Sequence, residues 1–382
     1  ASYFPALQID LVQYFGGEQS TVLFGLNGVS MAFLVWIIVL MAYVYIASTL
    51  PVWKLLQPRD YINSHQLLLG LAILYLGLLF TLPEVTAPAI NSAADDPSWF
   101  PLLFITIACG AISGFHGLVS SGTTSKQLNN ETDARFVGYF GSVGEGSLAL
   151  ISIIAVVTLF GNSAAFLDTY SSFSQAGSQG LGIFVKGAGQ LATGLGIPVN
   201  VGQTLVAVIV VSFAATTLDT SVRLMRYIIS ELGQEYHVEK LTRRHVATSI
   251  AVVSSAALVL IPEGPKGFGS GGYLLWPLFG TSNQLLAGIS FLLISIWLKK
   301  LGRPVIYTVI PMAFLLFMTL WAMVQQVVFQ WSGLGVQDAN WLLFIFGGFI
   351  LGFAFWIILE SIRILSGYGR AGASELQEET VS

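Results

Sequence analysis

The sequence predicts an all-α integral membrane protein of about nine transmembrane helices, some of them broken. Two features of the composition predict this class. Hydrophobic residues make up 54% of the 382 residues and charged residues only 9%, whereas soluble domains carry about a quarter charged residues. The 40 glycines and the aromatic share of 13% are typical of membrane helices, in which glycine allows close packing and aromatic rings lie at the interfaces.

Nine stretches are apolar and long enough to cross a bilayer core, which takes about 20 residues per helix. The predicted spans are residues 28–50, 64–82, 99–121, 139–161, 201–222, 246–262, 273–298, 304–330 and 340–365. They form one transmembrane domain, 28–366, between an extracytoplasmic segment, 1–27, and a disordered polar tail, 367–382. The Gly- and Ser-rich stretch after the fourth span is expected to hold a short helix, 183–195, that does not cross the membrane.

The distribution of positive charge predicts the orientation, because Lys and Arg concentrate on the cytoplasmic side of membrane proteins. If residues 1–27 lie outside, the inner segments carry 14 of the 16 Lys and Arg residues, and the outer segments carry only Lys186 and Lys266. We therefore expect residues 1–27 outside and the C-terminus inside, in a cytoplasmic (inner) membrane. The inner segment 223–245 is expected to begin as an extension of the fifth span along the inner surface.

The third predicted span carries two stripes at helical spacing. The small-residue stripe is Gly110, Gly114 and Gly117, and the polar stripe is Cys109, Ser113, His116 and Ser120. Small stripes let helix backbones approach closely, and polar groups in lipid should face a cavity or a partner. The serines could equally bond carbonyls of their own helix. An imidazole changes charge near neutral pH, so His116 is a candidate for proton coupling.

The end of the same span is a polar run in which the helix can unwind. Ser120, Ser121, Thr123 and Thr124 surround Gly122. Their oxygens, with unwound backbone groups, suit a monovalent cation or a substrate carboxylate. The alternative is an ordinary helix C-terminus capped by Gly122.

Two acidic residues lie within or beside predicted spans. Glu145 is about two turns into the fourth span, among glycines that favour the bundle interior, and is a candidate for protonation or for pairing with a buried cation. Asp219 ends the fifth span with Arg223 four residues later, so a local ion pair is the favoured interpretation. Two hydroxyls that could join an ion site there are Thr216 and Thr217.

The seventh span is predicted to be a broken helix. Its sequence around Pro277 and Gly280 is GSGGYLLWPLFGTSNQLLAG, and proline removes a backbone hydrogen bond. Broken helices are where secondary transporters expose backbone groups to substrate and ions. We expect Asn283 or Gln284 to satisfy the freed backbone groups or to face a cavity.

Four stretches of the sequence resemble motifs of the carbon starvation protein A family. They are PVWKLLQPRDY at 51–61, PLLFITIACGAISGFHGLVSSGTTSKQL at 101–128, LDTSVRLMRY at 218–227 and LWPLFGTSNQLLAG at 275–288. The resemblance implies an inner-membrane secondary transporter of peptides or pyruvate, linked to carbon starvation. It also implies an inverted-repeat fold like that of amino-acid/cation symporters. The residues that it places in shared motifs are Ser113, His116, Ser120, Thr123, Thr124, Glu145, Asp219, Asn283 and Gln284.

The leading functional hypothesis is therefore a proton- or Na⁺-coupled secondary transporter, with a peptide or pyruvate as substrate and lipid as its surroundings. Family chains usually begin with further membrane helices that have no counterpart in this sequence. The alternatives are a channel or a membrane subunit whose partner supplies these helices. The expected protein partners are further membrane helices or a second copy of the chain in a homo-oligomer. The sequence has no GxxxxGKS, HExxH or paired CxxC motif. We therefore predict no enzymatic activity, no metal or other cofactor, and no nucleic-acid partner.

Overall fold

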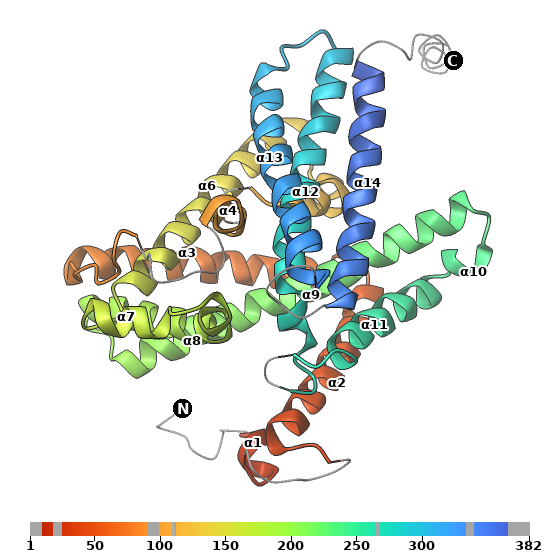
Figure 1. The fold of residues 1–382 in the computed structure, drawn as a ribbon. Helices are drawn as coiled ribbons and strands as arrows, with labels where there is room; N and C mark the ends of the chain where they lie inside the picture. The colour runs from red at the N-terminus through yellow and green to blue at the C-terminus, as the bar shows by residue number, and fades with distance from the viewer. Residues whose placement is uncertain are drawn as a thin grey trace. The chain divides into compact units, whose positions relative to one another are not determined.

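The computed structural model describes residues 10–17, 25–90, 99–108, 110, 112–264, 267–333 and 340–365. Every regular element in these ranges is a helix (Figure 1). The chain divides into two compact units: the first is Ala1–Asp96 with Val143–Leu274, and the second is residues 97–142 with 275–382. The predicted tail, 367–382, lies outside the described residues.

Most helices belong to one unit. The first unit contains α1 (Leu11–Tyr14), α2 (Gly28–Thr49), α3 (Leu56–Thr81), α7 (Ser163–Thr169), α8 (Phe173–Leu191), α9 (Val199–Glu235), α10 (Glu239–Thr242) and α11 (Arg244–Leu260). The second contains α4 (Phe104–Ala108), α5 (Gly114–Val119), α13 (Ile306–Val324) and α14 (Trp341–Leu365). Two long helices contribute to both units: α6 (Glu131–Val157) and α12 (Gly271–Lys300).

Seven helices in the described ranges are long and apolar enough to cross a membrane. They are α2, α3, α6, α9, α12, α14 and α13 with its continuation to Trp331. These match seven of the nine predicted spans, so the count of nine is not confirmed. The third span, 99–121, is split into α4 and α5. The sixth corresponds to α11, whose 17 residues reach about 26 Å, short of a core of about 30 Å.

The core of the first unit forms where α3, α6, α8 and α9 meet. Its buried side chains are Leu74, Ile151, Ala155, Ala188, Leu191 and Val206. A Cβ added to Gly187 would lie 2.0 Å from the Ala155 carbonyl oxygen, so this glycine lets α8 approach α6 closely. The short helix expected over 183–195 is longer in the structure, because Ser172 accepts from the Gln175 N–H and caps α8 ten residues earlier than predicted.

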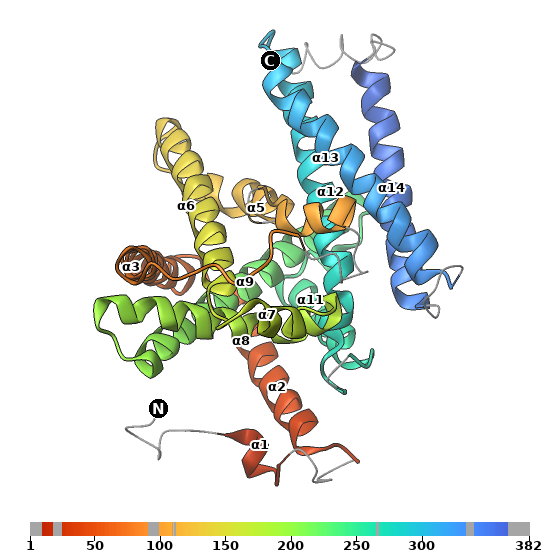
Figure 2. The same cartoon turned by 60° about the vertical axis from the view of Figure 1, so that its left-hand side comes forward.

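Helix α9 continues without interruption to Glu235, which confirms that the Arg-containing segment extends the fifth span. Its 37 residues reach about 55 Å, well beyond the thickness of a bilayer core. It packs against α2 and α11 through Val44, Val222 and Ala251 (Figures 1 and 2). The first predicted span ends as a simple helix end, because α2 stops at Thr49 just before Pro51.

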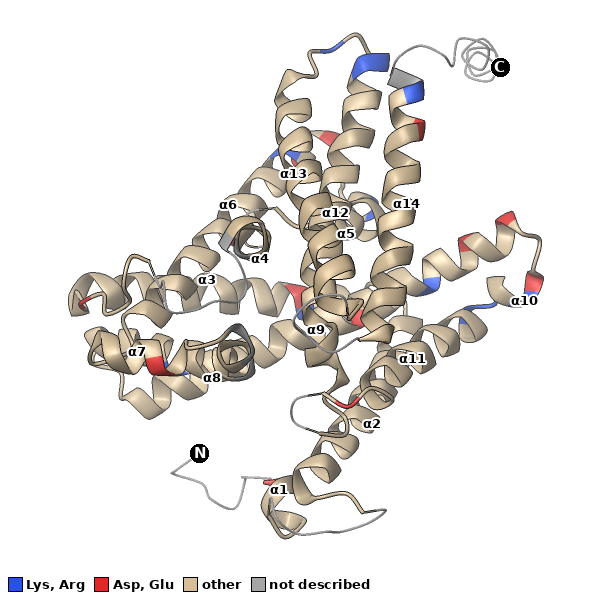
Figure 3. Cartoon of the chain, viewed as in Figure 1, with Lys and Arg blue, Asp and Glu red and all other residues tan. Residues whose placement is uncertain are grey.

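In the second unit, α12, α13 and α14 lie side by side (Figures 1 and 2). Leu285, Leu316 and Ala354 are buried between them. The last turns of α12 and α14 carry the basic residues Lys299, Lys300 and Arg363. Figure 3 shows these basic turns at the same end of the helix group.

Candidate functional site

The third span is broken between α4 and α5, in the middle of the predicted helix. Helix α4 ends at Ala108, Gly110 lies in a turn, and Ser113 has extended backbone with φ −124° and ψ 123°. The break confirms a broken third span, but its position differs from the prediction. The chain over Ser120–Thr124 does not unwind and forms a π-helical turn. The polar stripe is therefore interrupted, and Cys109 lies outside the described residues.

Helix α12 supplies the hydrogen-bond partners that the break needs. The Phe115 N–H, near the start of α5, donates to Asn283 Oδ1 at 2.7 Å, and Gln284 Nε2 donates to the Ile112 carbonyl at 2.9 Å. Asn283 also lies 3.3 Å from the Ser113 hydroxyl. The first N–H groups of a helix have no partner within the helix, and Ser113 does not cap α5 with its own side chain. Two consecutive side-chain amides on α12 therefore satisfy one backbone donor and one backbone acceptor at the break, the Phe115 N–H and the Ile112 carbonyl.

The small-residue stripe brings α5 against α12. A Cβ added to Gly114 would lie 2.2 Å from the Asn283 carbonyl oxygen and 2.5 Å from the Ala287 nitrogen. Both atoms belong to the backbone, so only glycine fits this position. A Cβ on Gly117 would meet the Ser290 hydroxyl at 3.2 Å. The predicted close helix contact is confirmed for these two glycines.

The predicted break in α12 is wrong, since the helix runs from Gly271 to Lys300 through Pro277. Polar side chains surround the turn that contains the proline. The Thr281 hydroxyl lies 3.1 Å from the Pro277 carbonyl and donates to Gln326 Oε1 at 2.6 Å, while Gln326 Nε2 lies 3.4 Å from that same carbonyl. Side chains of this kind let membrane helices tolerate proline. Asn283 and Gln284 do satisfy freed backbone groups, but those of the third span.

The hydroxyl groups after the break are already bonded within their own helix. Ser120 donates to the Gly117 carbonyl at 2.8 Å, and Thr123 donates to the Val119 carbonyl at 2.9 Å. Thr124 is half-buried in the same turn, and His116 is exposed on α5. Glu145 is half-buried in the part of α6 that belongs to the first unit, whereas His116 belongs to the second. Contact between these two residues stays a prediction.

A second polar cluster lies inside the first unit, around Asp219. This carboxylate on α9 is fully buried and pairs with Arg59 of α3, whose Nη2 lies 3.0 Å from Oδ1. Arg59 also donates to the Tyr43 hydroxyl at 2.8 Å. The predicted local pair with Arg223 is wrong. Arg223 instead donates to the carbonyls of Leu50 and Ala47, at 2.9 and 2.7 Å, where the dipole of α2 attracts a cation.

Neutral side chains continue this cluster along α3 and α9. The Ser212 hydroxyl donates to Asn63 Oδ1 at 2.5 Å, and Asn63 Nδ2 donates to the Thr216 hydroxyl. Thr217 stays outside the cluster, because its hydroxyl bonds the Phe213 carbonyl at 3.0 Å. Sequence reasoning missed Arg59, Asn63 and Tyr43. The only signal in the sequence was the spacing of Arg59 and Asn63, a cation and an amide one turn apart at the start of an apolar helix.

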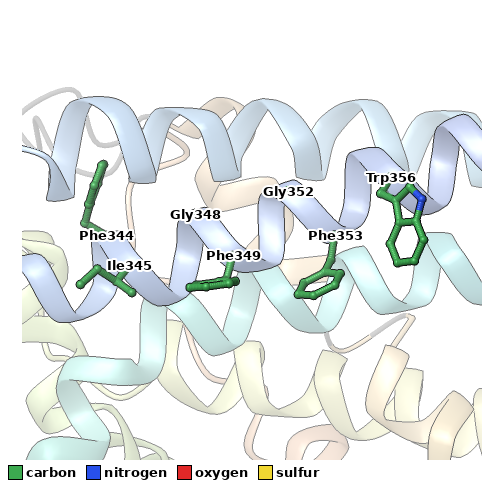
Figure 4. A pocket seen from close by; sticks show the side chains of 7 residues that line it. All are labelled: Phe344, Ile345, Gly348, Phe349, Gly352, Phe353 and Trp356. Atoms are coloured by element: carbon green, nitrogen blue, oxygen red, sulfur yellow. The ribbon is translucent and has the colours of Figure 1, made fainter.

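An apolar groove of about 570 Å³ runs along α14 (Figure 4). Its lining residues are Phe344, Ile345, Gly348, Phe349, Gly352, Phe353 and Trp356. The rings of Phe349, Phe353 and Trp356 project from the same helix. None of the lining side chains carries a charge, so the groove suits an acyl chain rather than a carboxylate.

These features define a multi-pass membrane protein in which a broken apolar span is held by polar side chains of a neighbouring helix. Broken spans of this kind are typical of secondary transporters. The family model described as carbon starvation protein CstA matches residues 11–176 and 161–322. The chain therefore belongs to this family, and both polar clusters lie within the matched residues.

Curated relatives carry transporter names. The peptide transporter CstA of Campylobacter jejuni is 33% identical, over 79% of this chain and 50% of the relative. The pyruvate/proton symporter BtsT of Escherichia coli is 31% identical, over 74% of this chain and 49% of the relative. The peptide transporter CstA of Bacillus subtilis is 28% identical, over 85% and 60%. The chain thus spans about half the length of the first relatives, and no solved structure matches it.

Proposed function

We propose that this chain forms part of a proton-coupled secondary transporter that carries peptides or pyruvate-like carboxylates across the cytoplasmic membrane during carbon starvation. The family and the names of the relatives support the class. The structural observation that supports it most is the break between α4 and α5. A membrane helix that stops in mid-span exposes backbone groups to which substrate or ions bind.

The candidate substrate site is this break, because one acceptor beside it has no hydrogen-bond partner. Gln284 is fully buried, and its Oε1 lacks a partner among the described residues. An unsatisfied buried polar atom costs about 1–3 kcal/mol. A substrate N–H group, a protonated carboxyl or a cation would each supply the missing contact. Asn283 then acts as a positioning residue, because its oxygen already holds α5.

The other candidate residues take roles around the break or in the first unit. In the second unit we propose Ser113, His116, Ser120, Thr123 and Thr124 as substrate or coupling-ion contacts. In the first unit we propose Glu145 and Thr217 as further contacts. We assign Asp219 and Thr216 to holding α3 against α9, because both are engaged in the Arg59 cluster. Na⁺ instead of H⁺ as the coupling ion remains the alternative.

The proposal includes an orientation, with residues 1–27 outside and the C-terminus in the cytoplasm. The shared position of the basic turns of α12 and α14 supports it (Figure 3). An inverted-repeat fold and a homo-oligomer, or further membrane helices that complete the site, belong to the same proposal. Impermeant thiol labelling in whole cells tests the orientation. A cysteine replacing Asp95 should react, and one replacing Lys54, an exposed residue of the predicted inner segment between α2 and α3, should not.

The decisive experiment measures pH-dependent uptake of pyruvate and of a dipeptide into proteoliposomes. His116→Gln keeps hydrogen bonding but cannot be protonated. We expect it to retain counterflow exchange and to lose accumulation driven by a pH gradient, because His116 is the proposed proton carrier. His65→Gln is the matched control, since His65 is also exposed on a helix and bonds the Tyr61 carbonyl of its own turn at 2.8 Å.

Two results would contradict the proposal. Accumulation by His116→Gln with an unchanged pH profile would remove proton coupling through this residue. Flux that shows no counterflow with either substrate would favour a channel over a transporter.

A further inference from the structure

Arg226 is a buried cation that forms no ion pair with a carboxylate of the described residues. Its side chain on α9 is 8% exposed, and its Nε has no hydrogen-bond partner. The guanidinium lies 4.6 Å from the centre of the Tyr227 ring, an attractive contact that leaves the net charge in place. Asp219 is the only fully buried carboxylate in the described ranges, and Arg59 occupies it. Buried charges are normally paired, but the described part of the chain supplies no counter-charge for Arg226.

The nearest charged groups increase this excess of positive charge. Arg223 and Arg244 are close enough to act on Arg226 electrostatically, and both are cations. Arg223 is also buried, and it bonds carbonyls rather than a carboxylate. Three guanidinium groups therefore gather where α2, α9 and α11 meet, and no acidic side chain within the described ranges forms an ion pair with Arg226.

The start of α11 adds a second site of positive potential at the same place. This helix begins at Arg244, has no side-chain cap and has no acidic residue in its first turn. Arg243, Arg244 and His245 instead occupy its N-terminal end. The N-terminus of a helix carries a partial positive charge that disfavours cations. A bound anion would reverse this repulsion and would accept from the uncapped N–H groups.

We infer that this cluster binds the headgroup phosphate of an anionic phospholipid. Guanidinium groups match phosphate oxygens in geometry and charge. A lipid is favoured over a free anion because α9 is long and apolar enough to cross a membrane, so the cluster lies on a helix that acyl chains can surround. The exposed apolar side chains of Met225, Ile228 and Leu232 lie on other faces of α9 than Arg226. The predicted orientation places the cluster at the cytoplasmic leaflet, which is rich in anionic lipid. This inference does not depend on the transported substrate.

The test measures thermal stabilisation of the purified 382-residue chain in detergent. The added probes are phosphatidylglycerol, phosphatidylcholine and inorganic phosphate. We expect saturable stabilisation by phosphatidylglycerol only. Arg244→Gln should weaken the apparent affinity about fivefold, as expected for one basic residue at an anionic surface. Arg226→Gln should weaken it by at least as much, and Arg226→Lys should recover part of the loss. Arg135→Gln is the matched control, because Arg135 is an exposed cation on α6, and it should bind normally.

Three outcomes would overturn the inference. Equal stabilisation by phosphatidylcholine would show that the headgroup charge is not recognised. Equal stabilisation by inorganic phosphate would show a site for a free anion. Unchanged affinity in Arg244→Gln would exclude the cluster as the lipid site even if the Arg226 variants fail to fold, because Arg244 is exposed and its replacement should leave the fold intact.

Discussion

The two polar clusters join their helices by different kinds of interaction. In the first unit, Arg59 and Asp219 join α3 to α9 by a buried ion pair. In the second, Asn283 and Gln284 join α12 to the backbone of a broken helix by neutral amides. A buried ion pair is costly to desolvate and tolerates the loss of neither partner. A neutral amide costs less to bury, so it suits the proposed site, where a substrate would compete for backbone groups.

The largest effect is expected from breaking the ion pair. Asp219→Ala removes the buried partner of Arg59 and leaves only the partly exposed Asp60 beside it, which should destabilise the protein by up to about 3–5 kcal/mol. Equilibrium unfolding of the purified protein in mixed detergents measures this change. The control is Asp60→Asn. Asp60 also contacts Arg59, at 3.5 Å, but its side chain is 44% exposed, so we expect a loss of at most about 1 kcal/mol.

A double variant separates charge from packing in the same pair. Arg59→Met with Asp219→Leu removes both charges and keeps apolar volume, a replacement that is often neutral or stabilising. We expect most of the lost stability to return. A double variant that stays as unstable as Asp219→Ala would mean that the pair stabilises the unit through Tyr43 and the neutral cluster rather than through charge.

The next largest effect is expected at the contact between α5 and α12. Gly114→Ala places a methyl group against two backbone atoms that cannot rotate away. Overpacking of this kind costs about 1–3 kcal/mol, and it should also displace α5 and lower counterflow exchange. Gly117→Ala is the control, because its new methyl group meets only the Ser290 side chain. Equal losses in both variants would contradict the close backbone contact.

A smaller effect is expected from removing the amide that holds the break. Asn283→Ala leaves the Phe115 N–H without its acceptor, at a cost of about 1–3 kcal/mol. The adjacent variant Ser282→Ala removes only a hydroxyl that bonds its own helix at Leu278 and should cost less than about 0.5 kcal/mol. Asn283→Asp keeps the acceptor oxygen, but a buried carboxylate is costly, so it should recover stability relative to Asn283→Ala only at a pH low enough to protonate it. Should all three variants unfold alike, Asn283 would have no special role at the break.

Sequence reasoning predicted the elements of the fold better than their contacts. Helices of spanning length follow from runs of apolar residues, so seven predicted spans correspond to long helices. The third span was predicted to be broken from its glycines and hydroxyls, but the exact position depends on Asn283 and Gln284, which are far away in sequence. The seventh span contains a proline that normally weakens a helix, and Gln326 from another helix contacts that turn.

The ion pair shows why local spacing misled the prediction. Arg223 is one turn after Asp219, and this spacing normally suits a salt bridge. The structure instead directs Arg223 to the C-terminal carbonyls of α2. Arg59, separated by 160 residues from Asp219, takes its place. Such a pairing follows from how α2, α3 and α9 pack, and a single sequence gives no measure of that packing.

The smallest effect is expected from Gly280→Ala, a variant that tests whether α12 stays the continuous helix that the structure shows. A Cβ on Gly280 would meet nothing within 4 Å, and glycine inside a helix costs about 0.5–1 kcal/mol relative to alanine. Gly280→Ala should therefore raise the free energy of unfolding by about this amount, in contrast to the loss expected for Gly114→Ala. Counterflow exchange should stay unchanged if α12 keeps one conformation through the transport cycle. A variant that is more stable but exchanges substrate more slowly would show instead that α12 must bend between Pro277 and Gly280. The amides of Asn283 and Gln284 would then belong to a moving helix, and the contrast with the rigid ion pair would become a difference in motion as well as in charge.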